Sequence, residues 1–184
     1  AECSNDLMLK SIRTYFFERA KKKRLRESVA IPVGFHLDRK NHYGLLTDAS
    51  NVDDRMTVNS FAEDLRRGGN RVKVLGYING KMETISTPFD IITINDISKV
   101  SHVPKGPLAE AFIGQGFDVL INLSIKENHL PLEYISTVSK AAFRIGPWYA
   151  RQTANPYHLC IDAGNTATLK EWISELMHTL QKIY

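Results

Sequence analysis

The hydrophobic positions divide the chain into short apolar runs and longer segments with helical spacing. Short apolar runs bounded by turn residues predict strands at residues 43–47, 71–77, 117–123, 142–145 and 157–161. Apolar residues recurring every three or four positions predict helices at residues 52–67, 107–115, 130–140 and 168–183. Because strands alternate with helices, we expect an α/β fold: a small, mainly parallel, doubly wound sheet, Rossmann- or flavodoxin-like, with helices on both faces.

The clearest local unit is the strand, helix and strand within residues 43–77. Ser50 or Asn51 can cap the helix, and Gly68-Gly69-Asn70 supplies the residue types that end one. This order predicts a right-handed crossover between parallel strands. Two stretches are less regular: residues 84–103 predict no element, and the alternation at 33–37 allows an edge strand.

The segment from Met8 to Glu27 predicts a basic amphipathic helix. Its apolar stripe consists of Met8, Leu9, Ile12, Tyr15 and Phe16. It carries eight basic and two acidic residues, a net charge of +6, whereas the whole chain carries +4. The remainder of the chain is therefore slightly acidic, and the basic character belongs to this one helix.

The length and composition predict one globular body. The chain has 184 residues, of which 43% are hydrophobic and 24% charged. We divide it into residues 1–27, a leader and the basic helix, and residues 28–184, a single α/β domain that we expect to fold without the first 27 residues. No apolar run is long enough to span a bilayer.

Several hydrophobic and turn motifs resemble a family of small bacterial α/β proteins of unknown function. They are Leu9–Ile12, Gly44–Asp48, Val72–Tyr77, Phe117–Leu123, Leu132–Tyr134, Ser139–Ala141 and Phe143–Gly146. The resemblance covers most of residues 8–184. It implies the fold and the domain limits, and it brings no activity with it.

Polar residues at the ends of the predicted strands are the candidates for a ligand cleft, because open α/β sheets bind ligands there. They are Asp48, Ser50, Asn51, Asn122, Ser124, Gly146, Trp148 and Asp162. The same residue types also cap helices and form turns, which is the commoner explanation. No glycine-rich phosphate loop follows the first strand, so the sequence predicts no nucleotide cofactor.

Cysteine and histidine residues predict neither a disulfide framework nor a metal site. Cys3 and Cys160 are the two cysteines, which favours a reducing, cytoplasmic compartment. His158, Cys160 and Asp162 share one strand face, but no second ligand pair accompanies them. The other histidines, His129 among them, have no acidic partner at a recognisable spacing.

The basic cluster is the feature that most favours a function. Its cationic residues, which we take as candidates for polyanion binding, are Lys21, Lys22, Lys23, Arg24 and Arg26. We therefore expect a non-enzymatic binding module attached to RNA, a ribonucleoprotein or another polyanion. An anionic membrane surface, a homodimer through the apolar stripe, or a helix that packs on its own domain are alternatives. A further alternative is an enzyme or small-ligand binder that uses the strand-end cleft.

Overall fold

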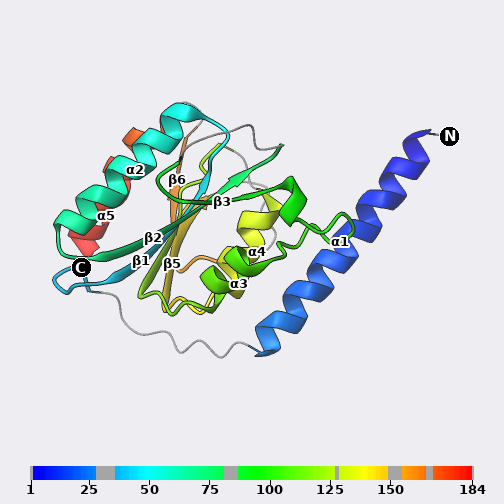
Figure 1. The fold of residues 1–184 in the computed structure, drawn as a ribbon, viewed down its shortest axis with the longest axis horizontal. Coiled ribbons are helices and arrows are strands. Elements are labelled where there is room, and N and C mark those ends of the chain that lie inside the picture. Colours follow the sequence, from blue (N-terminus) through cyan, green and yellow to red (C-terminus); the bar gives the residue numbers. More distant parts are fainter. Residues whose placement is uncertain are drawn as a thin grey trace.

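The computed structural model describes residues 2–27, 36–80, 87–126, 129–148, 155–164 and 168–183. Its strands are β1 (His42–Asp48), β2 (Arg71–Ile78), β3 (Asp90–Thr93), β4 (Val119–Asn122), β5 (Phe143–Trp148) and β6 (Leu159–Asp162). Its helices are α1 (Glu2–Glu27), α2 (Val52–Arg67), α3 (Pro107–Gly114), α4 (Leu130–Val138) and α5 (Leu169–Ile183), with a short 3₁₀ helix at Ile94–Asp96. The strands form one parallel sheet of order β3-β2-β1-β4-β5-β6 (Figure 1).

This architecture confirms the predicted α/β fold and shows that every strand pairing is parallel. Helix α2 has the predicted bounds, because Asn51 caps its first turn and Gly69, at a φ of 84°, follows its end. Strand β3 lies within residues 84–103, where no element was predicted. It is a four-residue edge strand that is only partly buried, so it carries little hydrophobic pattern. The edge strand that the alternation at 33–37 allows falls largely outside the described residues.

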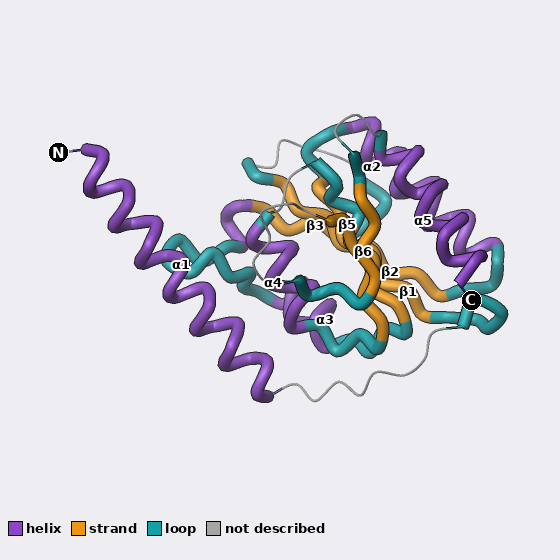
Figure 2. The backbone as a smooth tube through the Cα atoms, turned by 180° about the vertical axis from the view of Figure 1, so that it is seen from behind, coloured by secondary structure: helices purple, strands orange, loops and turns teal. Residues whose placement is uncertain are grey.

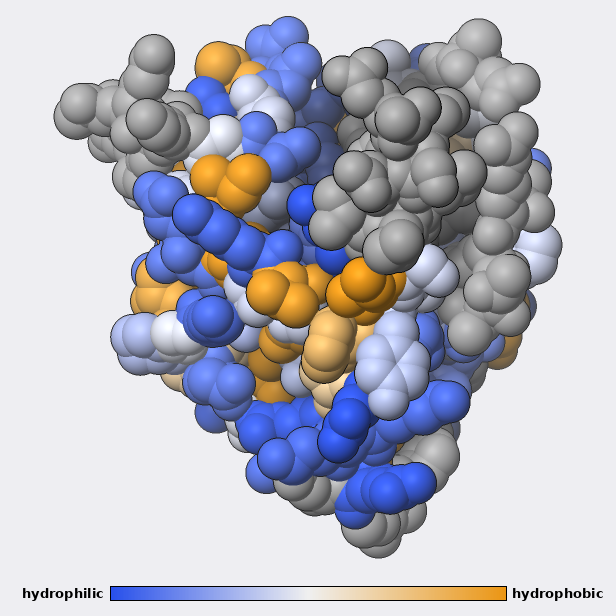
Figure 3. All heavy atoms as spheres, turned by 90° about the vertical axis from the view of Figure 1, so that its right-hand side faces the viewer, coloured by the Kyte–Doolittle hydropathy of each residue, from blue (hydrophilic) through white to orange (hydrophobic). Residues whose placement is uncertain are grey.

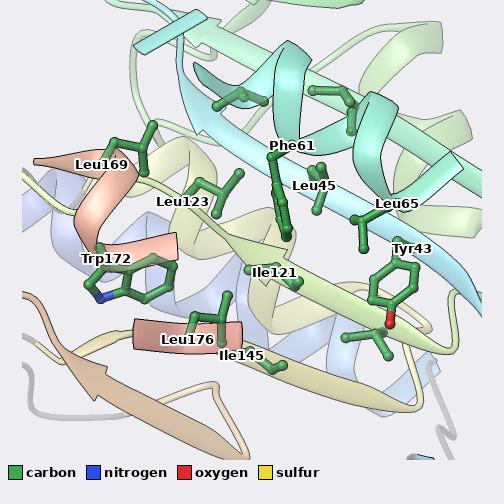
Figure 4. Packing of buried hydrophobic residues seen from close by; sticks show 14 of the residues in the cluster. Tyr43, Leu45, Phe61, Leu65, Ile121, Leu123, Ile145, Leu169, Trp172 and Leu176 are labelled. Carbon is green, nitrogen blue, oxygen red and sulfur yellow. The ribbon is translucent and has the colours of Figure 1, made fainter. Parts of the chain in front are cut away.

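Alternate residues of the central strands point to opposite faces and build two cores. Tyr43 and Leu45 of β1 face α2 and α5, whereas Leu46 faces α3 and α4. Figure 4 shows the first core, in which Trp172 and Leu176 of α5 meet Ile121 and Ile145 of the sheet. Helices on both faces explain why β1 and β4 are buried almost throughout.

Helix α1 lies outside the sheet and packs on α4, as the two opposite views show (Figures 1 and 2). The side chain that anchors it is Phe17, which is 3% exposed and belongs to the core cluster on the α3 and α4 side. Its ring makes an edge-to-face contact with Tyr134 of α4, with centroids 6.1 Å apart. Three residues of the expected stripe, Ile12, Tyr15 and Phe16, are exposed instead, and its other members, Met8 and Leu9, lie outside the described side chains.

Candidate functional site

The strand order reverses between β1 and β4, where an open α/β sheet places its ligand crevice. β1 ends at Asp48 and β4 ends at Asn122, and the two strands are hydrogen-bonded neighbours. Backbone N–H of Leu123 donates to the carbonyl of Leu46 and prolongs the pairing beyond β4. The predicted candidates Asp48, Asn122 and Ser124 are therefore brought to one edge of the sheet.

A buried histidine, His129, lies at this edge, and the sequence predicted no acidic partner for it. His129, directly before α4, places Nε2 at 3.1 Å from Oδ2 of Asp48. Its ring also makes an edge-to-face contact with Tyr77 of β2 at 5.3 Å. Burial alone raises the pKa of Asp48, but hydrogen bonds from His129 and Ser50 outweigh it and lower that pKa to about 2. The pair joins the end of β1 to the start of α4.

The described residues between the ends of β1 and β4 line a small cavity. The cavity lined by Asp48, Ser124 and Leu169 has a volume of about 10 Å³, which is room for about one water molecule. Asn51 Oδ1 accepts the backbone N–H groups of Asp53 and Asp54 at the start of α2. Of the two carboxylates in this first turn, that of Asp54 is paired with Nζ of Lys126 at 2.9 Å, and that of Asp53 disfavours a phosphate at the position where a Rossmann fold binds one. At this edge, the described polar side chains form hydrogen bonds and ion pairs with neighbouring groups of the chain.

A second polar network lies under β5. Nδ2 of Asn122 donates to the hydroxyl of Tyr157 at 2.6 Å, and Oδ1 accepts the N–H of Ser124. The tyrosine ring crosses Gly146, where a Cβ would stand 2.4 Å from it. Burial raises the pKa of Tyr157, which keeps its hydroxyl protonated. Asn122 and Ser124 thus have structural partners in the interior.

The remaining strand-end candidates lie away from this cavity. Trp148 and Asp162 end β5 and β6 and pair in register, and both are exposed. Asp162 accepts the N–H of Gly164, while Nδ1 of His158 accepts the N–H of Arg144. Within the described ranges, no group of three or more histidine, cysteine or acidic side chains is arranged to hold a metal.

Two of the five candidate cations of α1 hold the helix to the body. Lys21 is buried, and its Nζ lies 2.8 Å from Glu18 and 3.2 Å from Glu133 of α4. Burial lowers the pKa of Lys21, but the two carboxylates outweigh this effect and raise it above its usual value. Arg24 donates from Nη2 to Glu110 of α3 at 2.7 Å. These two cations contact the body of the protein.

The other cations lie on the outward side of α1. Lys22, Lys23 and Arg26 are exposed, as is Arg19, which the predicted set did not include. They line a groove of about 740 Å³ together with Tyr15, Phe16, Glu18, Ala20 and Ser101. Glu18 is already paired with Lys21, so the four cations leave the groove strongly positive. Within the described side chains, no salt bridge engages these four.

The side of the molecule that carries α1 mixes two kinds of surface. In Figure 3, strongly hydrophilic residues gather at the lower end, below hydrophobic patches. The exposed large hydrophobic residues of α1 are Ile12, Tyr15, Phe16 and Leu25. Tyr15 and Phe16 contact each other edge to face, with ring centroids 5.5 Å apart. The outward face of α1 therefore combines aromatic rings with positive charge.

Comparison with known proteins places the chain in a family without assigning it an activity. No described helix is both long and apolar enough to cross a bilayer. The search among curated proteins finds no match, and the expected bacterial origin stays a prediction. The model of the family of unknown function DUF6913 matches residues 10–183, which include most of α1 and the entire sheet. The chain belongs to this family, DUF6913.

Proposed function

We propose that the protein is a non-enzymatic binding module that attaches to RNA, free or within a ribonucleoprotein, through the outward face of α1. The observation that carries this proposal is the separation of charge on that helix. Lys21 and Arg24 are engaged by carboxylates of the body. The cations that remain exposed along one groove are Arg19, Lys22, Lys23 and Arg26.

Phosphates suit this groove because cations that bind a polyanion release its condensed counterions. Burial of Phe17 and the Lys21–Glu133 pair fix α1 before any partner arrives. A fixed helix loses less conformational freedom on binding than a free basic tail does. The docked helix therefore favours a defined binding site.

Two alternatives have less support. An enzyme or small-ligand binder would need space at the strand ends, and the cavity that described residues line beside Asp48 and Ser124 is about 10 Å³. An interfacial membrane helix separates a continuous apolar face from a polar one, whereas the exposed rings of α1 share their groove with the cations. We place the module in a reducing, cytoplasmic compartment, because its cysteines predict no disulfide framework.

The test is fluorescence anisotropy with a labelled 12-mer of uridine at low salt. Lys22→Ala/Lys23→Ala should weaken binding about tenfold, at roughly 0.7 kcal/mol for each lost contact. The matched control, Lys170→Ala/Lys182→Ala, removes the same charge from exposed positions of α5 and should leave affinity unchanged within about twofold.

Three outcomes would overturn the proposal. They are no binding of the RNA, an equal loss in the control variant, and sedimentation with vesicles of phosphatidylcholine and phosphatidylserine in the absence of RNA binding. The last result would assign α1 to an anionic membrane surface.

A further inference from the structure

The aromatic residues of the groove are not explained by charge alone. Tyr15 is 59% exposed and Phe16 is 40% exposed, although a third ring beside them, Phe17, is buried. Exposed rings leave apolar surface in contact with water, and these two line the same groove as the four cations. We infer that the groove takes a single strand of nucleic acid, with bases on Tyr15 and Phe16 and phosphates on the cations beyond them; this inference rests on the proposed function.

The order of residues along α1 supports this arrangement. One row runs through Tyr15, Arg19, Lys22 and Arg26, and a second runs through Phe16, Arg19 and Lys23. Each row starts at an aromatic ring and continues into cations. The first row covers about 16 Å of helix, so it can follow the backbone of a short strand over several phosphates.

The geometry of the two rings favours a single strand over a duplex. Their planes are inclined by 76° to each other. Bases that lie flat on both rings cannot also be stacked on each other, so the strand must open its bases at this point. Only unpaired nucleotides offer their faces in this way.

The turn before α3 supplies the opposite wall of the groove. Ser101 lines it across from the helix, so the groove is more than one helix face. The turn is fixed by the backbone bonds Ser98 N–H to Val103 and His102 N–H to Ser98. A preformed wall of this kind lowers the cost of ordering a strand beside α1.

Substitution of Tyr15 distinguishes stacking from charge. With the labelled uridine 12-mer, Tyr15→Leu should weaken binding about fivefold, since base stacking contributes about 1 kcal/mol or more. Tyr15→Phe keeps the ring and should bind within about twofold of wild type. Leu25→Ala is the matched control and should leave the affinity for RNA unchanged, because Leu25 is exposed on the same helix but does not line the groove.

The same strand annealed to an adenosine 12-mer should bind at least about fivefold more weakly, and Tyr15→Leu should leave that duplex affinity unchanged. Equal affinity for both forms, or equal losses in Tyr15→Leu and Tyr15→Phe, would overturn the inference while the proposed function stands. Failure of the wild type to bind RNA would overturn the proposed function itself. A thymidine DNA 12-mer that binds at least as tightly as uridine would remove only the assignment to RNA.

Discussion

The polar side chains at the ends of β1 and β4 are paired with one another, whereas the cations on the outward face of α1 are exposed. At the edge, Asp48 and His129 bind each other and leave a cavity of about 10 Å³. Along α1, Lys22 and Lys23 are exposed beside a groove of about 740 Å³. Among the described residues, the polar side chains at the ends of β1 and β4 thus engage one another, whereas the open, charged surface lies on a helix outside the sheet.

The strand order alone therefore does not decide whether the carboxyl edge of the sheet is open to a ligand. A parallel sheet brings polar residues to its carboxyl edge, but their pairing decides whether a ligand can enter. Here the polar residues of the edge have structural partners. The four cations of the groove have no such partner among the described side chains, and that is why the function is proposed there.

The largest expected effect concerns the anchor of α1. Phe17→Ala should lower the free energy of unfolding by about 3 kcal/mol, because the ring is buried against Tyr134 in the core. Urea unfolding measures this change. Phe16→Ala, at the exposed neighbour, should cost less than about 1 kcal/mol. Equal costs would mean that α1 does not pack on α4 through Phe17.

The orientation of α1 could not be predicted because three aromatic residues are adjacent in the sequence. Helical spacing assigned Tyr15 and Phe16 to the apolar stripe, and Phe17 fell outside it. The choice among the three is made by partners on other elements, namely Tyr134, Glu133 and Glu110. Residues 43–77 were predictable because the pattern there is local: buried runs, a capping asparagine and terminal glycines.

The second effect concerns the closed edge. Asp48→Asn should cost about 2 kcal/mol at pH 7, since the pKa of Asp48 falls from 3.8 to about 2 on folding. A lowered carboxyl pKa stabilises the fold fully above about pH 4, and this contribution is lost as the pH falls towards 2. The stability difference between wild type and variant should therefore shrink over that range.

Urea unfolding at several pH values measures this difference. Asp162→Asn, at the exposed end of β6, is the control and should change stability by less than about 0.5 kcal/mol. A cost for Asp48→Asn that stays constant from pH 7 to pH 2 would contradict the pairing with His129.

The pairing of Asp48 with His129 could not be predicted from the sequence pattern. Asp48 was a predicted candidate, but His129 lies 81 positions away and no spacing rule connects them. Topology could have connected them, because His129 directly precedes the helix that follows the neighbouring strand β4. Lys21 and Arg24 were taken as candidates for polyanion binding for a similar reason: their carboxylate partners are on α4 and α3.

The smallest expected effect concerns the wall of the groove opposite α1. Ser101→Lys adds a cation to the opposite wall of the groove and should tighten RNA binding about threefold at low salt. Ser60→Lys makes the same change in a depression between α2 and α5 and should have no effect beyond about twofold. Equal gains from the two variants would show that net charge, and not the groove, determines affinity.

The salt dependence of RNA binding tests the account most directly. Four cations on a single strand give a slope of about −3 in a plot of the logarithm of affinity against the logarithm of salt concentration. Lys22→Ala/Lys23→Ala should make that slope shallower by about 1.4, at roughly 0.7 for each lost contact, while Lys170→Ala/Lys182→Ala should retain the wild-type slope. A wild-type slope near zero, or one that the groove substitutions leave unchanged, would contradict the assignment of RNA binding to α1.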